Sequence, residues 1–148
     1  MTKTATTPVP EGWTLLGQSS AFVRLLGPLH VKEAGDHRLI GMRVEEKHLN
    51  TRGIAHGGML VTLADTALGV VLSFEQPPRP MVTVNLSVDF MSAARLGDWV
   101  EADVEIQRSG RQLAFASCRL AVEGRHVLRA SGVFAVVAPA RSRESFEG

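Results

Sequence analysis

An eighteen-residue apolar segment, residues 57–74, constrains the fold of this chain more than any other feature. It reads GGMLVTLADTALGVVLSF and is apolar on almost every side, which is typical of a helix buried inside a protein. A pair of buried strands is the alternative, but eighteen residues without a turn argue against it. We therefore expect one long helix in the interior of the fold.

The few small and polar residues of this segment fall on one side of the predicted helix. They recur at spacings of three and four residues, which is the repeat of a helix face. These residues are Gly58, Thr62, Asp65, Thr66, Gly69 and Ser73. The glycines and threonines among them would let a second backbone approach this face closely.

The second half of the chain has the period-two pattern of strands. Apolar and polar residues alternate over 82–90 and again over 100–107, after a break at Pro77-Pro78. Two further strands are expected at 113–122 and 126–137, each preceded by a short turn that contains glycine. Four strands joined in this way predict an antiparallel meander with one apolar face. The apolar residues of its first strand are Val82, Val84, Leu86, Val88 and Phe90.

Shorter elements are expected before the long helix. A short helix over 18–26 would end at Gly27-Pro28, because proline disfavours a helical conformation in the residue before it. Two short strands are expected between Leu29 and Glu46, joined by a turn at 34–36.

The expected sheet has an apolar face that another element must cover, and only the long helix is long and apolar enough to do so. The predicted fold class is therefore α+β, with an antiparallel sheet wrapped around a helix. A chain of 148 residues is the usual size of a single domain. Residues 1–12 and 139–148 are expected to be loose termini.

Composition and charge exclude several classes of partner. Sixteen basic and fifteen acidic residues give a formal net charge of +1, so we expect neither nucleic acid nor a membrane surface as a partner. The chain shows no secretory signal and no apolar run long enough to span a bilayer. These features predict a cytoplasmic protein.

The chain offers little for metal or thiol chemistry. Cys118 is the only cysteine and lies in an alternating strand, so we expect it to pack in the core rather than act as a nucleophile. The spacings of His48, His56 and Asp65 match no zinc pattern. We therefore expect neither a metal nor a redox cofactor.

Asp65 is the strongest candidate for a catalytic group. A carboxylate in the middle of an apolar helix is unfavourable unless something compensates its charge. The alternative is a structural acid that caps backbone amides or pairs with an arginine at a subunit contact. We favour a functional acid.

The long helix begins with two glycines, Gly57 and Gly58, directly after His56. Glycines there leave N–H groups open to a ligand, and the helix dipole favours negative charge, as an oxyanion hole requires. For the glycines alone, a tight turn into the helix is the simpler interpretation. His56 is expected to shape this turn through a local hydrogen bond, with proton transfer as the less favoured role.

The spacing of these groups predicts a dimer. Asp65 lies eight residues after Gly57, which is about 12 Å along a helix axis at about 1.5 Å per residue. One chain therefore cannot easily aim both groups at one substrate. Two chains with antiparallel helices side by side could do so, and symmetry would then give two equal sites.

The segment from residue 48 to residue 69, HLNTRGIAHGGMLVTLADTALG, resembles the signature of the PaaI-like acyl-CoA thioesterases of the hotdog-fold superfamily. The matching positions are Asn50, Gly53, His56, Gly57, Gly58, Asp65 and Gly69. The resemblance continues through TVNLSVDFMSAARLGD and SGRQLAFASCRL and covers roughly residues 38–138. It implies a hotdog fold, in which a curved antiparallel sheet wraps a long central helix, assembled into homodimers and often homotetramers.

The same resemblance implies roles for the site residues in hydrolysing an acyl-CoA to a carboxylic acid and CoA. Asp65 would act as a general base on water or as a nucleophile. The Gly57 N–H would donate to the thioester oxygen, with His56 supporting the loop. Asn50 would orient water or the leaving sulfur, and Thr83 occupies a position near the acid. Coenzyme A enters as part of the substrate, and no separate cofactor is implied.

In similar proteins the CoA phosphates and adenine lie near the loops after the long strands. Here these loops carry Arg95, Arg108, Ser109, Gly110 and Arg111, and Gly58 is a further expected substrate contact at the helix start. The alternative for each arginine is an ordinary surface charge.

Two other functions remain as alternatives. One is an acyl-thioester hydratase or dehydratase, whose motifs we do not find. The other is a non-catalytic acyl-CoA sensor, which would be expected to lose Asp65 while keeping the pocket. The sequence leaves open the acyl group, which could be aryl, phenylacetyl, medium-chain or long-chain, and the choice between dimer and tetramer.

Overall fold

The long apolar segment forms helix α2, Gly57–Ser73, as the sequence predicts. The computed structural model describes residues 7–17, 19–75 and 77–137. One face of α2 is buried against the sheet, and this face comprises Met59, Leu60, Leu63, Ala64, Ala67, Leu68 and Leu72. No helix in the described part of the chain is both long and apolar enough to cross a membrane.

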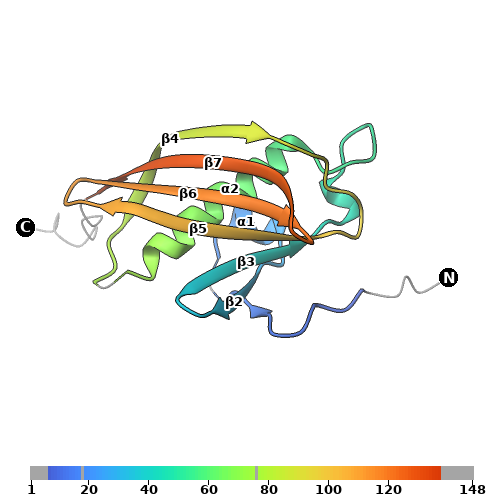
Figure 1. The fold of residues 1–148 in the computed structure, drawn as a ribbon, viewed down its shortest axis with the longest axis horizontal. Helices are drawn as coiled ribbons and strands as arrows, with labels where there is room; N and C mark the ends of the chain where they lie inside the picture. Colours follow the sequence, from blue (N-terminus) through green and yellow to red (C-terminus); the bar gives the residue numbers. More distant parts are fainter. Residues whose placement is uncertain (1–6, 18, 76, 138–148) are drawn as a thin grey trace, which may run out of the picture.

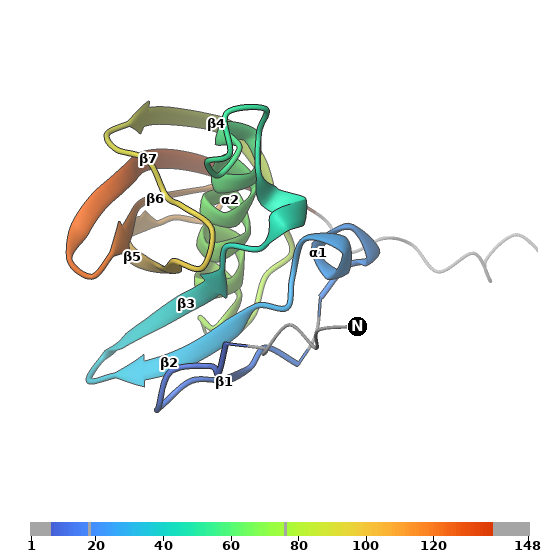
Figure 2. The ribbon, with the colours of Figure 1, turned by 90° about the vertical axis from the view of Figure 1, so that its right-hand side faces the viewer.

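Seven strands form one antiparallel sheet that curves around α2 (Figure 1, Figure 2). They are β1 (Thr14–Leu15), β2 (His30–Ala34), β3 (His37–Arg43), β4 (Met81–Phe90), β5 (Trp99–Ser109), β6 (Leu113–Val122) and β7 (Arg125–Val136). Their order across the sheet is β1-β2-β3-β5-β6-β7-β4. This architecture confirms the predicted fold class, a long helix wrapped by an antiparallel sheet.

Two short helical elements precede α2. Helix α1, Ala21–Leu26, is shorter than the predicted 18–26 because Ser20 caps it, with its hydroxyl oxygen accepting the Val23 N–H at 3.2 Å. The 3₁₀ turn η1, Glu46–His48, leads from β3 toward α2. The predicted turn between β2 and β3 is present, with Gly35 at a φ of 64° that favours glycine.

The position of β4 corrects the predicted meander. Strands β5, β6 and β7 do form a meander, but β4 pairs with β7 and lies at the edge of the sheet. Crossing from β4 to β5 means passing three strand spacings of about 4.8 Å each. The connection 91–98 can span that distance at about 3.3 Å per residue. A connection of this length therefore allows β4 to pair with β5, as in the predicted meander, or with β7, as observed. The hydrophobic period does not distinguish these two topologies.

A β-bulge corrects the predicted faces of β4. Its register against β7 shifts between Thr83 and Asn85, which leaves Val84 as the extra residue. An extra residue reverses the alternation of side chains on either side of it. Thr83 therefore faces α2, while Val82 and Val84 are 49% and 59% exposed rather than packed in the core.

The outer face of the sheet, opposite α2, is partly covered by the segment before β1. Trp13 from this segment is buried and packs edge-to-face on Trp99 of β5, with ring centroids 5.2 Å apart. Of residues 1–12, only 7–12 are described, and among them the Pro8 carbonyl accepts a hydrogen bond from Arg43 at 2.7 Å. The other predicted loose segments, 1–6 and 139–148, lie outside the described residues.

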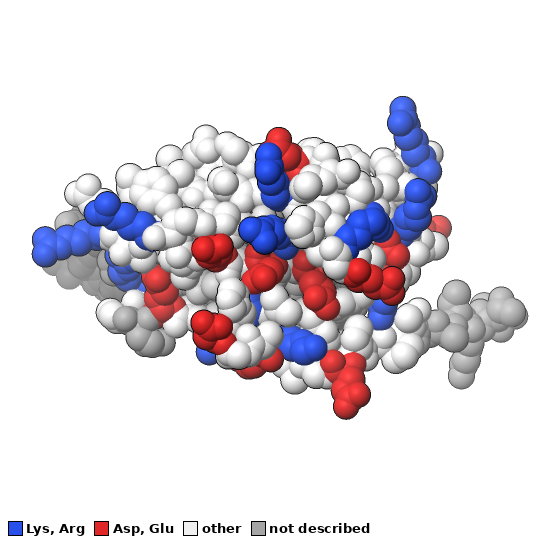
Figure 3. All heavy atoms as spheres, viewed as in Figure 1, with Lys and Arg blue, Asp and Glu red and all other residues white. Residues whose placement is uncertain are grey.

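Basic and acidic side chains are interspersed over the outer face of the sheet (Figure 3). One such pair joins neighbouring strands: Arg129 on β7 binds Asp89 on β4 with an N–O distance of 2.9 Å. Neighbouring charges of opposite sign therefore largely cancel on this face.

The two tryptophans on the outer face enclose Gly41 and make the glycine necessary. A Cβ at this position would lie 2.6 Å from Trp99 and 2.7 Å from Trp13, closer than carbon atoms can pack. We expect Gly41→Ala to lower the free energy of unfolding by about 1–3 kcal/mol, the usual effect of overpacking. Urea denaturation would measure it. Gly17→Ala is the control, because a Cβ there meets nothing within 4 Å. Equal midpoints for the two variants would contradict this packing.

Candidate active site

Asp65 lies in the middle of α2, half-buried, on the side that the sheet leaves uncovered. The Thr83 hydroxyl of β4 donates a hydrogen bond to Asp65 Oδ1 at 2.7 Å. Within the described part of the chain, no basic side chain lies within 4.0 Å of this carboxylate and no backbone amide caps it. Among the described residues, Asp65 therefore neither caps backbone amides nor pairs with an arginine of its own chain, and one carboxylate oxygen stays free for chemistry.

The small and polar stripe forms the uncovered face of α2, as the spacing predicts. Two of its hydroxyls are already satisfied within the helix: Thr62 donates to the Gly58 carbonyl at 2.9 Å and Ser73 to the Val70 carbonyl at 2.6 Å. Asp65 is therefore the ionisable group of this face. The face lies next to β4, the free edge of the sheet (Figure 2).

His56 is the N-cap of α2, and the predicted local hydrogen bond is present. Its Nδ1 accepts the Gly58 N–H at 2.9 Å. A ring nitrogen that accepts this bond carries no proton, so Nε2 is the nitrogen that can donate. The Gly58 N–H, expected from the sequence as a substrate contact, is occupied by His56.

Gly57 supplies the free donor at the start of α2. Its N–H has no hydrogen-bond partner among the described residues, and it sits at the positive end of the helix dipole. Phe90, at the end of β4, lies beside it: a Cβ on Gly57 would come within 3.1 Å of the ring. Phe90 is not among the site residues that the sequence indicates, because its contact with Gly57 joins segments far apart in the chain.

Asn50 organises the loop before α2. Its side-chain Oδ1 accepts the N–H groups of Arg52 at 2.9 Å and of Ile54 at 3.3 Å. Its own N–H donates to the Ile54 carbonyl at 2.8 Å. The side-chain NH₂ is therefore the part of Asn50 that a substrate or a water could contact.

His48 is buried and structural. Its Nδ1 accepts the Glu45 N–H at 2.9 Å, and its Nε2 contacts the Leu26 carbonyl of α1 at 2.7 Å, a distance that requires the proton on Nε2. Its backbone carbonyl accepts the His56 N–H at 2.8 Å. His48 thus ties α1 to the start of α2. Among the described residues, no group of three or more His, Cys, Asp or Glu side chains could hold a metal ion.

The arginines that the sequence grouped lie at opposite ends of α2. The backbone of Arg95 forms an isolated antiparallel β-bridge with that of Ile54, just before the helix begins. The hairpin 108–111 lies at the other end, where Arg79 donates to Ser109 at 2.6 Å. A helix of 17 residues is about 25 Å long, so the two groups are separated by roughly that distance.

Within the hairpin, the four residues have different roles. Ser109 donates to Glu75 at 2.6 Å, and the Gly110 carbonyl accepts from Arg79 at 2.5 Å, so both hold the hairpin in place. Arg108 and Arg111 are exposed and line a surface hollow of about 730 Å³. These two arginines are the ones free to meet a phosphate at this end of the helix.

Cys118 is buried in β6, as the sequence predicts. Burial, with a smaller effect from the negative charge of Asp103, raises the pKa of this thiol to about 12. The thiol is therefore protonated at neutral pH. Since the thiolate is the nucleophilic form, Cys118 is not a catalytic nucleophile.

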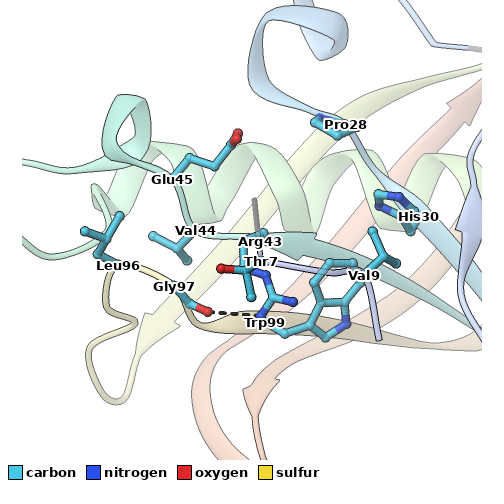
Figure 4. A pocket seen from close by; sticks show the side chains of 10 residues that line it. All are labelled: Thr7, Val9, Pro28, His30, Arg43, Val44, Glu45, Leu96, Gly97 and Trp99. Carbon is cyan, nitrogen blue, oxygen red and sulfur yellow. Dashed lines mark hydrogen bonds between the residues drawn. The ribbon is translucent and has the colours of Figure 1, made fainter. Parts of the chain in front are cut away.

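A separate hollow of about 410 Å³ lies on the outer face of the sheet (Figure 4). Arg43 of β3 and Trp99 of β5 line it together with His30. The next residues along these strands, Met42 and Val100, point to the core, so the sheet separates this hollow from α2. It is therefore not part of the Asp65 site.

Comparison with known proteins decides the family. Residues 52–128 match the family model of the Thioesterase superfamily. This chain belongs to that superfamily. A Pseudomonas aeruginosa protein that is named only provisionally as an esterase is 47% identical over 128 residues, covering 85% of this chain and 96% of that protein. Mouse acyl-coenzyme A thioesterase 13 is 33% identical over 114 residues, covering 71% and 81%.

Solved thioesterase structures share the fold. Zebrafish thioesterase superfamily member 2 is 29% identical with a TM-score of 0.74, covering 80% of this chain and 88% of that one. A variant of PaaI from Thermus thermophilus is 27% identical with a TM-score of 0.71, covering 80% and 100%. These similarities confirm the PaaI-like hotdog resemblance.

One further structure contains a ligand of interest. A hypothetical thioesterase from Streptococcus pneumoniae was solved with coenzyme A, and it is 26% identical with a TM-score of 0.67, covering 74% of this chain and 86% of that one. The same protein has also been solved as variants in which an aspartate or a threonine is replaced by alanine.

Proposed function

We propose that this thioesterase hydrolyses an acyl-CoA in active sites that two subunits share. The observation that carries the proposal is the pairing of one free N–H, that of Gly57, with one free carboxylate, that of Asp65, on a single helix. Hydrolysis of a thioester requires both groups: a donor where negative charge develops on oxygen, and a base for the attacking water. The acyl-CoA substrate is supported by the mouse acyl-CoA thioesterase and by the coenzyme A complex of the Streptococcus pneumoniae protein.

The geometry of α2 supports a shared site. Gly57 and Asp65 stand eight residues apart on one helix, about 12 Å along its axis. A second α2, packed antiparallel against the uncovered face, would bring the Gly57 of one subunit toward the Asp65 of the other. Strand β4 lies at the edge of the sheet and exposes Val82 and Val84, so its unpaired edge could join the same subunit contact. We therefore propose at least a homodimer.

In the proposed mechanism, Thr83 and Gly57 hold the reacting groups. The Thr83 hydroxyl fixes Asp65 Oδ1, which leaves Oδ2 to take a proton from water as the water attacks the thioester carbon. The carbonyl oxygen then becomes negative, and one donor such as the Gly57 N–H is worth about 10²–10³ in rate. When the carbon–sulfur bond breaks, the proton on Asp65 passes to the departing CoA sulfur.

Asp65 could alternatively attack the thioester carbon directly, and its free Oδ2 serves both pathways. In either one, the side-chain NH₂ of Asn50 would orient water or the leaving sulfur. His56 would hold the start of α2, and with it the Gly57 N–H, in place through its hydrogen bond with the Gly58 N–H. The two residues replaced in the Streptococcus pneumoniae protein, an aspartate and a threonine, are of the same types as Asp65 and Thr83.

The CoA end of the substrate would meet the arginines. In the antiparallel pair that sets the Gly57 of one α2 level with the Asp65 of the other, the second helix runs on about 12 Å beyond the start of the first. Arg95 of one subunit and the 108–111 hairpin of the other would then approach the same end of one site. The exposed guanidinium groups of Arg108 and Arg111 can bind phosphate oxygens in pairs of hydrogen bonds.

Replacing Asp65 tests the central residue. Asp65→Asn keeps the size and can still accept from Thr83, but it removes the base, so kcat for acyl-CoA should fall by at least about 10². The melting temperature should stay the same or rise slightly, because an unfavourable charge is removed. Release of CoA thiol, followed with DTNB, measures the rate. Asp89→Asn is the matched control, since Asp89 pairs with Arg129 on the outer face. A lowered melting temperature with near-normal kcat would show that Asp65 is structural.

Mixed subunits test the shared site. Gly57 is the first residue of α2, where proline is tolerated, and His56 already has the extended conformation (φ −63°, ψ 132°) that a following proline requires. Gly57→Pro therefore removes the donor N–H and allows the helix to form, with the exposed Phe90 ring moving a few tenths of an ångström away from the added Cβ. Each of Gly57→Pro and Asp65→Asn should be inactive alone, and refolding them together should restore part of the activity through hybrid dimers. A fully active monomer in light scattering would contradict the shared site.

Alanine substitutions test the CoA contacts. Arg95→Ala, Arg108→Ala or Arg111→Ala should raise KM for acyl-CoA wherever the guanidinium meets a phosphate. The same variant should hardly change hydrolysis of an N-acetylcysteamine thioester, which lacks the nucleotide. Equal losses on both substrates for every variant would mean that these arginines only maintain the structure.

A further inference from the structure

Helix α1 shows apolar side chains on two neighbouring faces. Val23 and Leu26, three residues apart, pack against the core, as the helical repeat allows. Phe22 and Leu25, also three residues apart, point away from it and are 63% and 75% exposed. Exposure of two large apolar side chains on a helix of six residues needs an explanation.

The exposed face of α1 lines a hollow that extends to His56, the N-cap of α2. The hollow has a volume of about 300 Å³ and is lined by residues of α1, η1 and the start of α2. Figure 2 shows these three elements close together. Its apolar walls are Phe22, Leu25, Leu26, Leu49 and Met59. His56 lines it as well, and His56 is the residue that precedes the free Gly57 N–H.

We propose that this hollow is the subsite for the acyl group, and that Phe22 and Leu25 select an apolar acyl chain longer than acetyl. The inference rests on the proposed function, because it places the thioester carbonyl at the Gly57 N–H. From that point an acyl group can pass His56 directly into the hollow, whose lining is mostly apolar. A volume of about 300 Å³ is at the lower limit for small-molecule pockets, which fits an acyl group rather than a whole acyl-CoA.

The polar groups at the rim of the hollow explain why the acyl chain should be uncharged. Lys47 donates to the Gly27 carbonyl at 2.6 Å and lies 3.3 Å from a Glu45 carboxylate oxygen, so its charge is already balanced. Both ring nitrogens of His48 are bonded to the backbone. A terminal carboxylate on the acyl chain would therefore find no free cation in this hollow.

The same rim contacts hold α1 in place. The Leu26 carbonyl accepts from His48, and the Gly27 carbonyl accepts from Lys47. Since the His48 backbone also binds the His56 N–H, the wall of the hollow and the oxyanion donor are fixed by one buried residue. The position of Phe22 and Leu25 relative to Gly57 is therefore set by structure rather than by a mobile loop.

Side-chain truncation tests the subsite. Phe22→Ala and Leu25→Ala remove exposed groups, so folding should be preserved, and kcat/KM should be measured with octanoyl-CoA and acetyl-CoA. We expect the octanoyl-to-acetyl ratio to fall by about 10-fold or more, the usual effect of lost apolar contacts in a pocket. Leu15→Ala is the matched control: Leu15 is 64% exposed on β1, outside this hollow, and its ratio should not change.

Filling the hollow gives an independent test. Leu25→Trp should lower the octanoyl-to-acetyl ratio still further, because the larger ring occupies the space of the chain. A ratio that stays constant in all three variants would overturn the inference, and so would a uniform rise of KM for both substrates, which would place the pantetheine arm there. Dissociation of the variants into monomers would assign α1 to a subunit contact and also overturn it. If the wild-type protein hydrolysed neither thioester, the proposed function would fail first.

Discussion

Burial of one face of α2 against the curved sheet is the contact on which the rest of this structure depends. Because the sheet covers only one side, the opposite side, with Asp65 at its centre, is left open. A helix wrapped completely would have trapped that carboxylate in an apolar core at a large cost in free energy. The partial wrap therefore satisfies two requirements at once: it supplies the core, and it leaves a half-buried acid accessible to a substrate.

The edge strand β4 couples this core to the site. Its bulge at Val84 turns Thr83 toward α2, where the hydroxyl holds Asp65, and Phe90 at its far end packs beside Gly57. One strand thus touches both groups proposed to act on the thioester. The same bulge exposes valines along the free edge, so the feature that orients the acid also prepares the surface proposed for the second subunit.

The two glycine N–H groups at the start of α2 have different roles. The Gly58 N–H donates to His56 Nδ1 and stabilises the helix start, and the Gly57 N–H stays free for the substrate proposed here. His48 stabilises this arrangement from behind by joining α1, η1 and His56. The buried histidine is thus a positioning residue, and the exposed face of α1 next to it gives the site its proposed acyl specificity.

The sequence by itself determined the elements and the main site residues. The helical period located α2, the period of two located the long strands, and the isolated acid with the paired glycines indicated Asp65 and Gly57, because these signals are local. Tertiary structure alone decided that β4 pairs with β7, that the bulge turns Thr83 inward, that Gly58 is occupied, and that Arg95 lies far from Arg108. Each of these depends on contacts between segments distant in the chain, and a hydrophobic period reports which face a residue occupies but not which strand it meets.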